Sequence, residues 1–264
     1  YHLKSIIYLI GNRKNFDTIF IFSYPPTMNL IAIFTKKILK KKTIYSIWEL
    51  YPEIAQKLNE LNSKFLLNSF KKVDNFCLGS IDEVVVNSDE MKQYLIDVRK
   101  VNADKISVIY HFANEKESPR SPKITKEIMY AGNLGTPQNV ESFLNLFSLS
   151  EKKYRLTIYG SGSQFDSIVS RESMNISVNS FISRNELLQK THHIPFALVS
   201  LSPKITVEGF PGKTFDYLKM NKILIGFSNP NSSLAKFIEK YELGINISPN
   251  EDNLDSKLQT LEDK

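Results

Sequence analysis

Continuous runs of apolar and β-branched residues recur along this chain and alternate with segments of helical periodicity. A strand that is apolar throughout is typical of a sheet covered on both faces, and strand-helix alternation is typical of parallel βαβ units. In the first part of the chain the pattern predicts helices near 26–40, 62–78 and 88–97, and strands at 17–23, 42–47, 82–88 and 105–110. The sequence therefore predicts a doubly wound α/β architecture.

The second part of the chain repeats this pattern with more strands. It predicts strands at 126–132, 154–160, 176–181, 195–201, 222–228 and 244–248. A polar segment with two prolines, 111–126, reads as a linker. We therefore expect two Rossmann-like domains with doubly wound parallel sheets, spanning 1–115 and 116–264. The first has only four predicted strands, so it is expected to be incomplete and to lack its opening βα units.

The composition excludes several classes of protein. The 264 residues suffice for one or two domains of about 150 residues each. A single cysteine, Cys77, excludes an intramolecular disulfide and a multi-cysteine zinc site, and it favours a reduced, cytoplasmic setting. No run of about 20 apolar residues could span a membrane. Because the chain begins at Tyr1 without methionine and its first domain is short, we expect a piece of a longer protein.

The net charge of +6 is concentrated in one segment, "TKKILKKK", at the end of a predicted apolar helix. Its five lysines are Lys36, Lys37, Lys40, Lys41 and Lys42. Three interpretations stay open: a solvated helix end that complements the helix dipole, a contact with the inner face of a membrane, and nucleic-acid binding. No nucleic-acid-binding signature accompanies the lysines, so no nucleic-acid partner is expected.

Two glycine-bearing turns follow predicted strands in the second domain. Ligands of doubly wound sheets bind beyond the carboxyl ends of the strands, where glycine lets the backbone approach a phosphate closely. The turns contain Gly132, Asn133 and Gly135, and then Gly160, Ser161 and Gly162. Each turn taken alone is equally typical of a plain tight turn.

A third segment, "VEGFPGKTFDYLKM" at 207–220, lacks the glycine spacing of a nucleoside-triphosphate loop. A helix starting at Pro211 or Gly212 would leave the amides of Gly212, Lys213 and Thr214 for an anion, with the Lys213 ammonium beside them. Asp216 would then be placed to bind a sugar diol. The alternative is a capped helix with an ordinary intrahelical ion pair. Together the three segments indicate a pocket for a nucleoside diphosphate linked to a polyhydroxylated group.

The order of these segments resembles the carboxyl-terminal half of family 4 glycosyltransferases, retaining enzymes of the GT-B fold. The resemblance runs through "YAGNLGTPQN", "LTIYGSGSQ", "VNSFISRNELLQ", "FALVSLSP" and "VEGFPGKTFDYLKMNKILIGFS". In the first half, "FDTIFIFSYPPTMNLIA" and "SIWELYPE" resemble the branch that builds capsules and O-antigens. The resemblance extends over nearly the whole chain.

The resemblance implies roles for particular residues. Glu208 would lie near the transferred sugar and Asp216, where the family more often has Glu, would bind the ribose. Phe181 and Ile182 would line the base pocket, followed by Arg184. The first turn lacks the family's Arg and Lys, so Lys213 and Arg184 would neutralise the diphosphate. The remaining donor-site residues implied are Gly209, Phe210 and Pro211.

The expected reaction is transfer of a sugar, with retention, from a nucleotide donor to a saccharide or polyprenyl-linked acceptor in surface polysaccharide biosynthesis. Lys213 would stabilise the departing diphosphate, and Glu208 would orient the sugar hydroxyls or stabilise positive charge. No Asp-x-Asp motif is present, so neither a metal nor another cofactor is expected. Because the acceptor loop that follows the family's first strand is missing, the chain as given is expected to bind donor without turning it over.

Other interpretations stay open at this point. Glu49 and Glu53 are candidates for contacting the acceptor. For Glu53 the alternative is a favourable charge at a helix start. His111, His192 and His193 are less favoured as acid-base groups. The competing functions are a non-catalytic nucleotide-sugar-binding or assembly module, and a sugar-phosphate isomerase or epimerase that shares only the fold.

Overall fold

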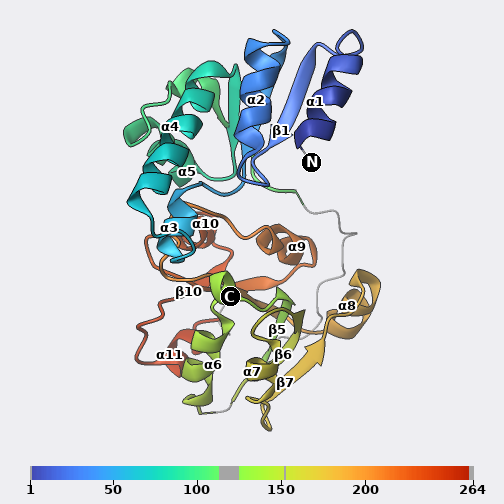
Figure 1. The fold of residues 1–264 in the computed structure, drawn as a ribbon. Coiled ribbons are helices and arrows are strands. Elements are labelled where there is room, and N and C mark those ends of the chain that lie inside the picture. Colours follow the sequence, from blue (N-terminus) through green and yellow to red (C-terminus); the bar gives the residue numbers. More distant parts are fainter. Residues whose placement is uncertain (1, 113–124, 152, 262–264) are drawn as a thin grey trace. The chain divides into compact units, whose positions relative to one another are not determined.

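The computed structural model describes residues 2–112, 125–151 and 153–261. The chain forms two compact units, each with its own parallel sheet (Figure 1). Unit 1 contains residues 1–110 and the short segment 207–210, and unit 2 contains residues 111–206 and 211–264. The segment 207–210 thus packs with unit 1, although the sequence had placed it in the second domain.

Unit 1 is built on four parallel strands in the order β1-β2-β3-β4. The strands are β1 (Thr18–Phe22), β2 (Lys42–Ile47), β3 (Glu83–Val86) and β4 (Ile106–Val108). The helices are α1 (His2–Gly11), α2 (Met28–Lys37), α3 (Glu53–Lys57), α4 (Lys64–Ser80) and α5 (Asp89–Asp97), with the 3₁₀ turn η1 (Ala103–Lys105). The four predicted strands are confirmed, whereas α1 was not predicted.

The apolar faces of these helices explain why they pack on the sheet. Cys77 and Leu78 of α4 join Val84 and Val86 of β3 in one buried cluster. The helix α4 begins where the Ser63 hydroxyl accepts a hydrogen bond from the Leu66 amide, as is usual at an N-cap. Local capping and helical periodicity therefore agree with the tertiary packing of this unit.

The lysine segment was predicted to form a single cationic helix end, but in the structure it is divided between a helix and a strand. The helix α2 ends at Lys37, and Lys42 already belongs to β2. Lys36 pairs with Asp82 at 2.5 Å, Lys42 with Glu83 at 2.7 Å, and Lys41 with Asp17 at 3.6 Å. Acidic residues brought close by the fold thus neutralise three of the five lysines. Across the described residues, no helix is both long and apolar enough to cross a membrane.

Unit 2 is built on six parallel strands in the order β10-β9-β8-β5-β6-β7. The strands are β5 (Glu127–Asn133), β6 (Arg155–Ser161), β7 (Ile176–Ser180), β8 (Phe196–Ser200), β9 (Ile223–Phe227) and β10 (Gly244–Ile247). The other elements are η2 (Thr136–Gln138), α6 (Val140–Ser148), α7 (Phe165–Val169), α8 (Arg184–Thr191), α9 (Lys213–Lys219), α10 (Ser233–Lys240) and α11 (Leu254–Gln259). This is the Rossmann order, and all six predicted strands are confirmed.

The strand order reverses between β5 and β8, which is where doubly wound sheets bind their ligands. These two strands pair only at Ile128 with Phe196 and at Met129 with Ala197. Farther along, the Ala131 amide donates to the Tyr217 hydroxyl at 2.7 Å, and that hydroxyl donates to the Ala131 carbonyl at 3.0 Å. The Tyr217 side chain of α9 therefore takes the hydrogen-bonding place of a neighbouring strand, and β5 parts from β8.

Candidate functional site

Lys213, the first residue of α9, turns its side chain onto β5 near the switch point of unit 2. Its ammonium nitrogen lies 3.9 Å from the centre of the Tyr130 ring. A Cβ atom added at Gly132, where φ is +138°, would come within 2.8 Å of the same nitrogen. The backbone conformation thus favours glycine at 132, and the end of the lysine side chain occupies the space beside it.

The Lys213 ammonium is buried, and the residues described provide no hydrogen-bond partner for it. Burial lowers its pKa to about 7, and the nearby Asp216 carboxylate opposes the shift. The predicted intrahelical pair with Asp216 does not form, because that carboxylate lies 3.2 Å from the Arg184 guanidinium. A buried cation without a counter-ion is costly, so this position is suited to an anion.

The second glycine turn supports the first one directly. A Cβ at Gly160 would lie 2.5 Å from the Gly132 carbonyl oxygen, and one at Gly162 would lie 2.4 Å from that of Leu134. The Leu134 amide donates to the Ser161 carbonyl at 2.8 Å. Close packing between the two turns therefore requires glycine at 160 and 162, and at Gly162 the backbone conformation, with a φ of +146°, requires it as well.

Hydrogen bonds within the first turn hold it in shape. The Tyr130 hydroxyl donates to the Asn133 carbonyl at 2.6 Å, and the Asn133 side-chain amide donates to Gln138 Oε1 at 3.0 Å. Gly135 is the N-cap residue of η2. A turn that is satisfied internally stays preorganised when a ligand approaches.

In the third segment, the sequence predicts that three backbone amides at the start of the helix stay free to bind an anion. The structure differs from this prediction. The helix begins at Lys213 with Gly212 as its N-cap, and the Thr214 amide already donates to the Pro211 carbonyl at 3.1 Å. The turn at Pro211 thus uses one of the three amides expected to bind an anion. The Thr214 and Ser200 hydroxyls are buried and find no hydrogen-bond partner within the described part of the chain.

The residues expected around the nucleoside lie at the start of α8. The Ser183–Glu186 capping box fixes this helix end and presents Arg184, which pairs with Asp216. Phe181 is 68% exposed, and Ile182 is half-buried. Arg184 and Asp216, expected to bind diphosphate and ribose respectively, neutralise one another in the ligand-free protein.

Glu208 belongs to the segment of unit 1 that includes Gly209 and Phe210. Its carboxylate is buried and lies 2.7 Å from the Lys57 ammonium. The Phe210 ring lies edge-on to Tyr110, with 6.2 Å between ring centres. The predicted site residues therefore fall into two groups: Glu208, Gly209 and Phe210 lie in unit 1, and the others lie in unit 2.

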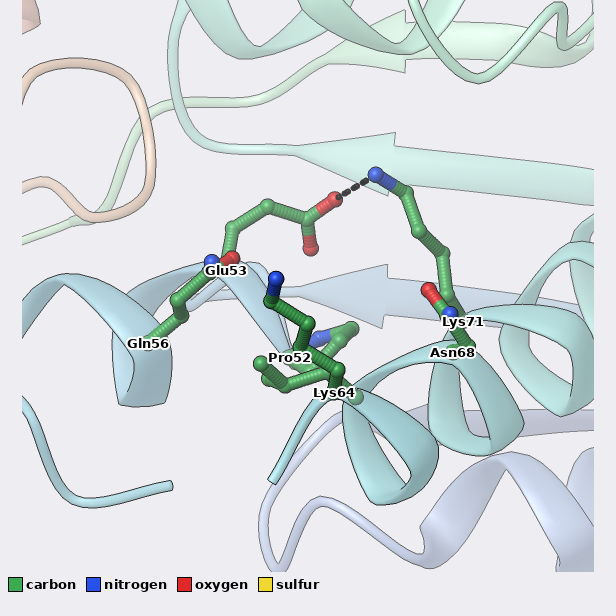
Figure 2. A pocket seen from close by; sticks show the side chains of 7 residues that line it. Pro52, Glu53, Gln56, Lys64, Asn68 and Lys71 are labelled. Carbon is green, nitrogen blue, oxygen red and sulfur yellow. Dashed lines mark ion pairs between the residues drawn. The ribbon is translucent and has the colours of Figure 1, made fainter. Parts of the chain in front are cut away.

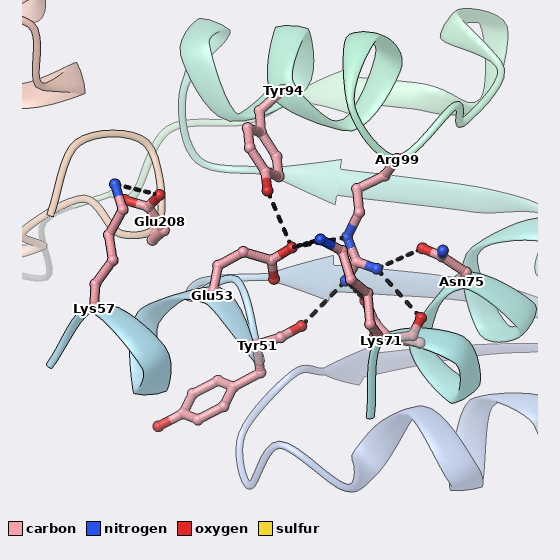
Figure 3. A network of polar contacts seen from close by, with 9 residues as sticks. Tyr51, Glu53, Lys57, Lys71, Asn75, Tyr94, Arg99 and Glu208 are labelled. Carbon is pink, nitrogen blue, oxygen red and sulfur yellow. Dashed lines mark hydrogen bonds and ion pairs between the residues drawn. The ribbon is translucent and has the colours of Figure 1, made fainter. Parts of the chain in front are cut away.

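Glu53 belongs to a polar network inside unit 1 (Figure 3). One of its oxygens lies 3.2 Å from Arg99 Nε, 3.5 Å from the Lys71 ammonium and 3.1 Å from the Tyr94 hydroxyl. The Arg99 guanidinium also donates to Asp74 at 2.7 Å. As the first residue of α3, Glu53 agrees with the alternative of a helix start.

A small cavity of about 160 Å³ adjoins this network (Figure 2). Side chains of α3 and α4 line it, including Gln56, Lys64 and Asn68. The other acid considered for an acceptor contact, Glu49, is exposed, although partial desolvation of its carboxyl group raises its pKa. Glu53 is thus held inside a network, whereas Glu49 lies at the surface.

The histidines divide between the two ends of the unit 2 sheet. His192 and His193 precede β8, at the amino ends of the strands, and His193 lies 3.5 Å from Glu127. His111 lies beside α9, with 6.3 Å between its ring centre and that of Phe215. His111 is thus near the candidate site, whereas the other two lie at the edge where doubly wound sheets do not bind ligands.

Sequence reasoning missed two tyrosines and one lysine. Tyr130 and Tyr217 are the largest fully buried side chains, and they hold the first turn and α9 in place. Lys57 is the ion-pair partner of Glu208. A tyrosine within an apolar strand or helix looks like ordinary core, so no local signal marks these residues. Among the described residues no group of three or more His, Cys, Asp or Glu side chains could hold a metal ion.

Comparison with known families and structures agrees with this geometry. Residues 3–117, which include most of unit 1, match the family described as Glycosyltransferase Family 4. Comparison with curated proteins gives no match. Among solved structures, Anabaena Alr3699/HepE in complex with UDP is 14% identical, with a TM-score of 0.73 over 98% of this chain and 72% of that chain.

Two further structures share the architecture. Sucrose-phosphate synthase from Thermosynechococcus elongatus is 12% identical, with a TM-score of 0.71 over 97% of this chain and 67% of that chain. The lipopolysaccharide outer core galactosyltransferase WaaB is 16% identical, with a TM-score of 0.64 over 93% of this chain and 66% of that chain. The chain thus has the GT-B fold and spans about two thirds of the length of these two structures.

Proposed function

We propose that the protein is a glycosyltransferase that moves a sugar from a nucleoside-diphosphate donor to a saccharide or lipid-linked acceptor. The observation that carries the proposal is the buried, unpaired Lys213 ammonium at the switch point of the unit 2 sheet. A diphosphate would satisfy this cation. The match of residues 3–117 to a glycosyltransferase family and the UDP named with a structural neighbour support the same conclusion.

Within this proposal, Lys213 binds the diphosphate and stabilises the negative charge that develops on it as the glycosidic bond breaks. Phe181 and Ile182 contact the base. Asp216 gives up its ion pair with Arg184 and accepts hydrogen bonds from the ribose hydroxyls. Arg184 is then available to the phosphates. Glu208 contacts the hydroxyls of the transferred sugar.

Retention of anomeric configuration and a role in surface polysaccharide synthesis, including capsule and O-antigen, complete the proposal. Retention rests on the resemblance of the second-half segments to a family of retaining enzymes, and the polysaccharide role rests on the likeness of "SIWELYPE" and the preceding segment to the branch that builds capsules and O-antigens. Product analysis with a panel of nucleotide sugars would test retention, since NMR distinguishes the anomers directly. An inverted product would remove retention from the proposal.

Titration calorimetry with UDP and GDP tests the donor site itself. Binding of at least one diphosphate, and weaker binding of the nucleoside alone, is expected because the phosphates meet Lys213. If neither diphosphate binds, the proposed function is wrong. Binding without product from any nucleotide sugar would instead favour a non-catalytic nucleotide-sugar-binding module.

Diphosphate binding is expected to take up a proton near Lys213. The lysine has a pKa of about 7 without ligand, and an adjacent phosphate raises it. At a pH between the pKa of Lys213 in the free protein and its higher pKa in the complex, the complex holds more protons than the free protein. The affinity for UDP therefore falls as the pH rises, by up to about tenfold per pH unit. Calorimetry at pH 8.5 in buffers of different ionisation enthalpy measures the uptake, and an uptake near zero would contradict this role for Lys213.

Donor binding and transfer are expected to need no divalent metal. A cationic lysine can supply the charge stabilisation that a metal provides elsewhere. We therefore expect EDTA to change the affinity for UDP less than about twofold. Calorimetry with EDTA and then with added Mg²⁺ makes the comparison, and a loss of affinity that Mg²⁺ restores would overturn the expectation.

We place the protein in the cytoplasm, in contact with the inner face of the membrane through the lysine segment. Because Lys36, Lys41 and Lys42 pair with acids, Lys37 and Lys40 are expected to carry the contact. Replacing both by glutamate should abolish co-sedimentation with anionic vesicles at low salt. Unchanged co-sedimentation of this variant would exclude the contact.

A further inference from the structure

The segment 207–210 is fixed to unit 1 through its backbone. The Leu50 amide donates to the Glu208 carbonyl at 2.8 Å, and Glu49 forms an antiparallel bridge with Gly209. Val207 packs against the buried cluster of this unit. The Cα atom of Glu208 is therefore held by main-chain contacts that do not depend on its carboxylate.

A second set of contacts fixes the Glu208 carboxylate. Oε1 lies 2.7 Å from the Lys57 ammonium, and Oε2 accepts a hydrogen bond from the Val207 amide at 3.1 Å. The Glu208 side chain is only 3% exposed, whereas that of Lys57 is 36% exposed. Lys57 thus supplies the positive charge that keeps a buried carboxylate oriented.

The short helix α3 presents Lys57 from a rigid base (Figure 3). Its first residue, Glu53, is held by Arg99, Lys71 and Tyr94. Lys57 is its last residue, one turn farther along the helix. The buried network at one end of α3 therefore fixes where the lysine at the other end can reach.

We propose that Lys57 is a positioning residue for Glu208, holding its carboxylate oriented toward the hydroxyls of the donor sugar. This inference rests on the proposed function, in which Glu208 contacts that sugar. Lys57 acts only through Glu208 and leaves the binding of the nucleoside diphosphate to unit 2. The opposite role, a latch that withholds Glu208 from the sugar, predicts changes of the opposite sign.

The test compares affinities for UDP-glucose and UDP, both measured by calorimetry on the full chain. The ratio of the two affinities isolates the contribution of the sugar. In Lys57→Gln we expect this ratio to fall about tenfold, with the affinity for UDP itself changed less than twofold. Lys57→Arg keeps the charge and should restore most of the ratio.

Two further variants separate positioning from general damage. Glu208→Gln should lower the ratio to a similar extent. In the double variant, Lys57→Gln should lower the ratio little further, because both substitutions act on the same contact. Lys64→Gln, at an exposed lysine that begins α4, is the matched control and should keep the wild-type ratio. Fluorescence of the single Trp48 confirms that unit 1 stays folded.

Each outcome decides the proposal. An unchanged ratio in Lys57→Gln or in Glu208→Gln overturns it, as does an equal fall in the Lys64→Gln control. A higher ratio in Lys57→Gln would assign the latch instead. If the wild-type chain binds neither UDP nor GDP, the proposed function fails first and this inference falls with it.

Discussion

Replacing Lys213 by methionine is expected to lower the affinity for UDP by at least about a hundredfold. Methionine fills similar space beside Tyr130 and Gly132, so the turn keeps its shape while the charge is lost. Titration calorimetry on both proteins measures the effect. Lys236→Met, at an exposed position of α10, is the matched control and should bind UDP like the wild type. A Lys213→Met protein that binds UDP normally would remove the site proposed in unit 2.

The same substitution is expected to stabilise the ligand-free protein. A buried ammonium without a counter-ion costs free energy on folding, and an apolar side chain of similar size does not. We expect the free energy of unfolding to rise by about 2 kcal/mol at pH 7. Scanning calorimetry of both variants without ligand would show it. A lower melting temperature in Lys213→Met would mean that the ammonium has a counter-ion in the free protein.

The stability difference also has a definite pH dependence. Lys213 has a pKa of about 7 in the folded chain, below its ordinary value of 10.5. Between these two values the unfolded chain binds more protons, so the wild type gains stability as the pH rises, by up to about 1.4 kcal/mol per unit. Lys213→Met lacks this gain. The gap between the two proteins should therefore narrow from pH 7 toward pH 10.

Arg99→Ala is expected to destabilise unit 1 by about 3–5 kcal/mol. The Arg99 side chain is fully buried, and it pairs with both Glu53 and Asp74. Its removal leaves two carboxylates in the interior. Burial raises the pKa of Asp74 to about 6 even while Arg99 opposes the shift. The guanidinium is therefore the group that keeps this acid ionised at neutral pH.

Urea unfolding followed by Trp48 fluorescence tests this expectation, because the only tryptophan of the chain lies in unit 1. Arg13→Ala, at an exposed arginine of the same unit, removes the same side chain without opening the network and should change stability by less than about 0.5 kcal/mol. Equal effects of the two substitutions would show that the Arg99 network contributes no more than a surface arginine.

The sequence by itself was sufficient for the architecture. Continuous apolar runs marked all ten strands, because a strand covered on both faces needs apolar residues at every position. Glycine and proline marked the turns at the carboxyl ends of β5 and β6, where the backbone must bend tightly. Composition and alternation are local properties, so they can be read along the chain. The sequence therefore predicted the positions of these turns, and the ligand site proposed at them stays a prediction.

Only the tertiary structure decided what the side chains of those segments do. Lys213 turns toward Tyr130 of β5, while Asp216 pairs with Arg184. The segment carrying Glu208 packs with unit 1, where Lys57 meets it. Such pairings join residues far apart in the sequence and depend on packing geometry. Periodicity and spacing carry no information about them, which is the physical reason they could not be predicted.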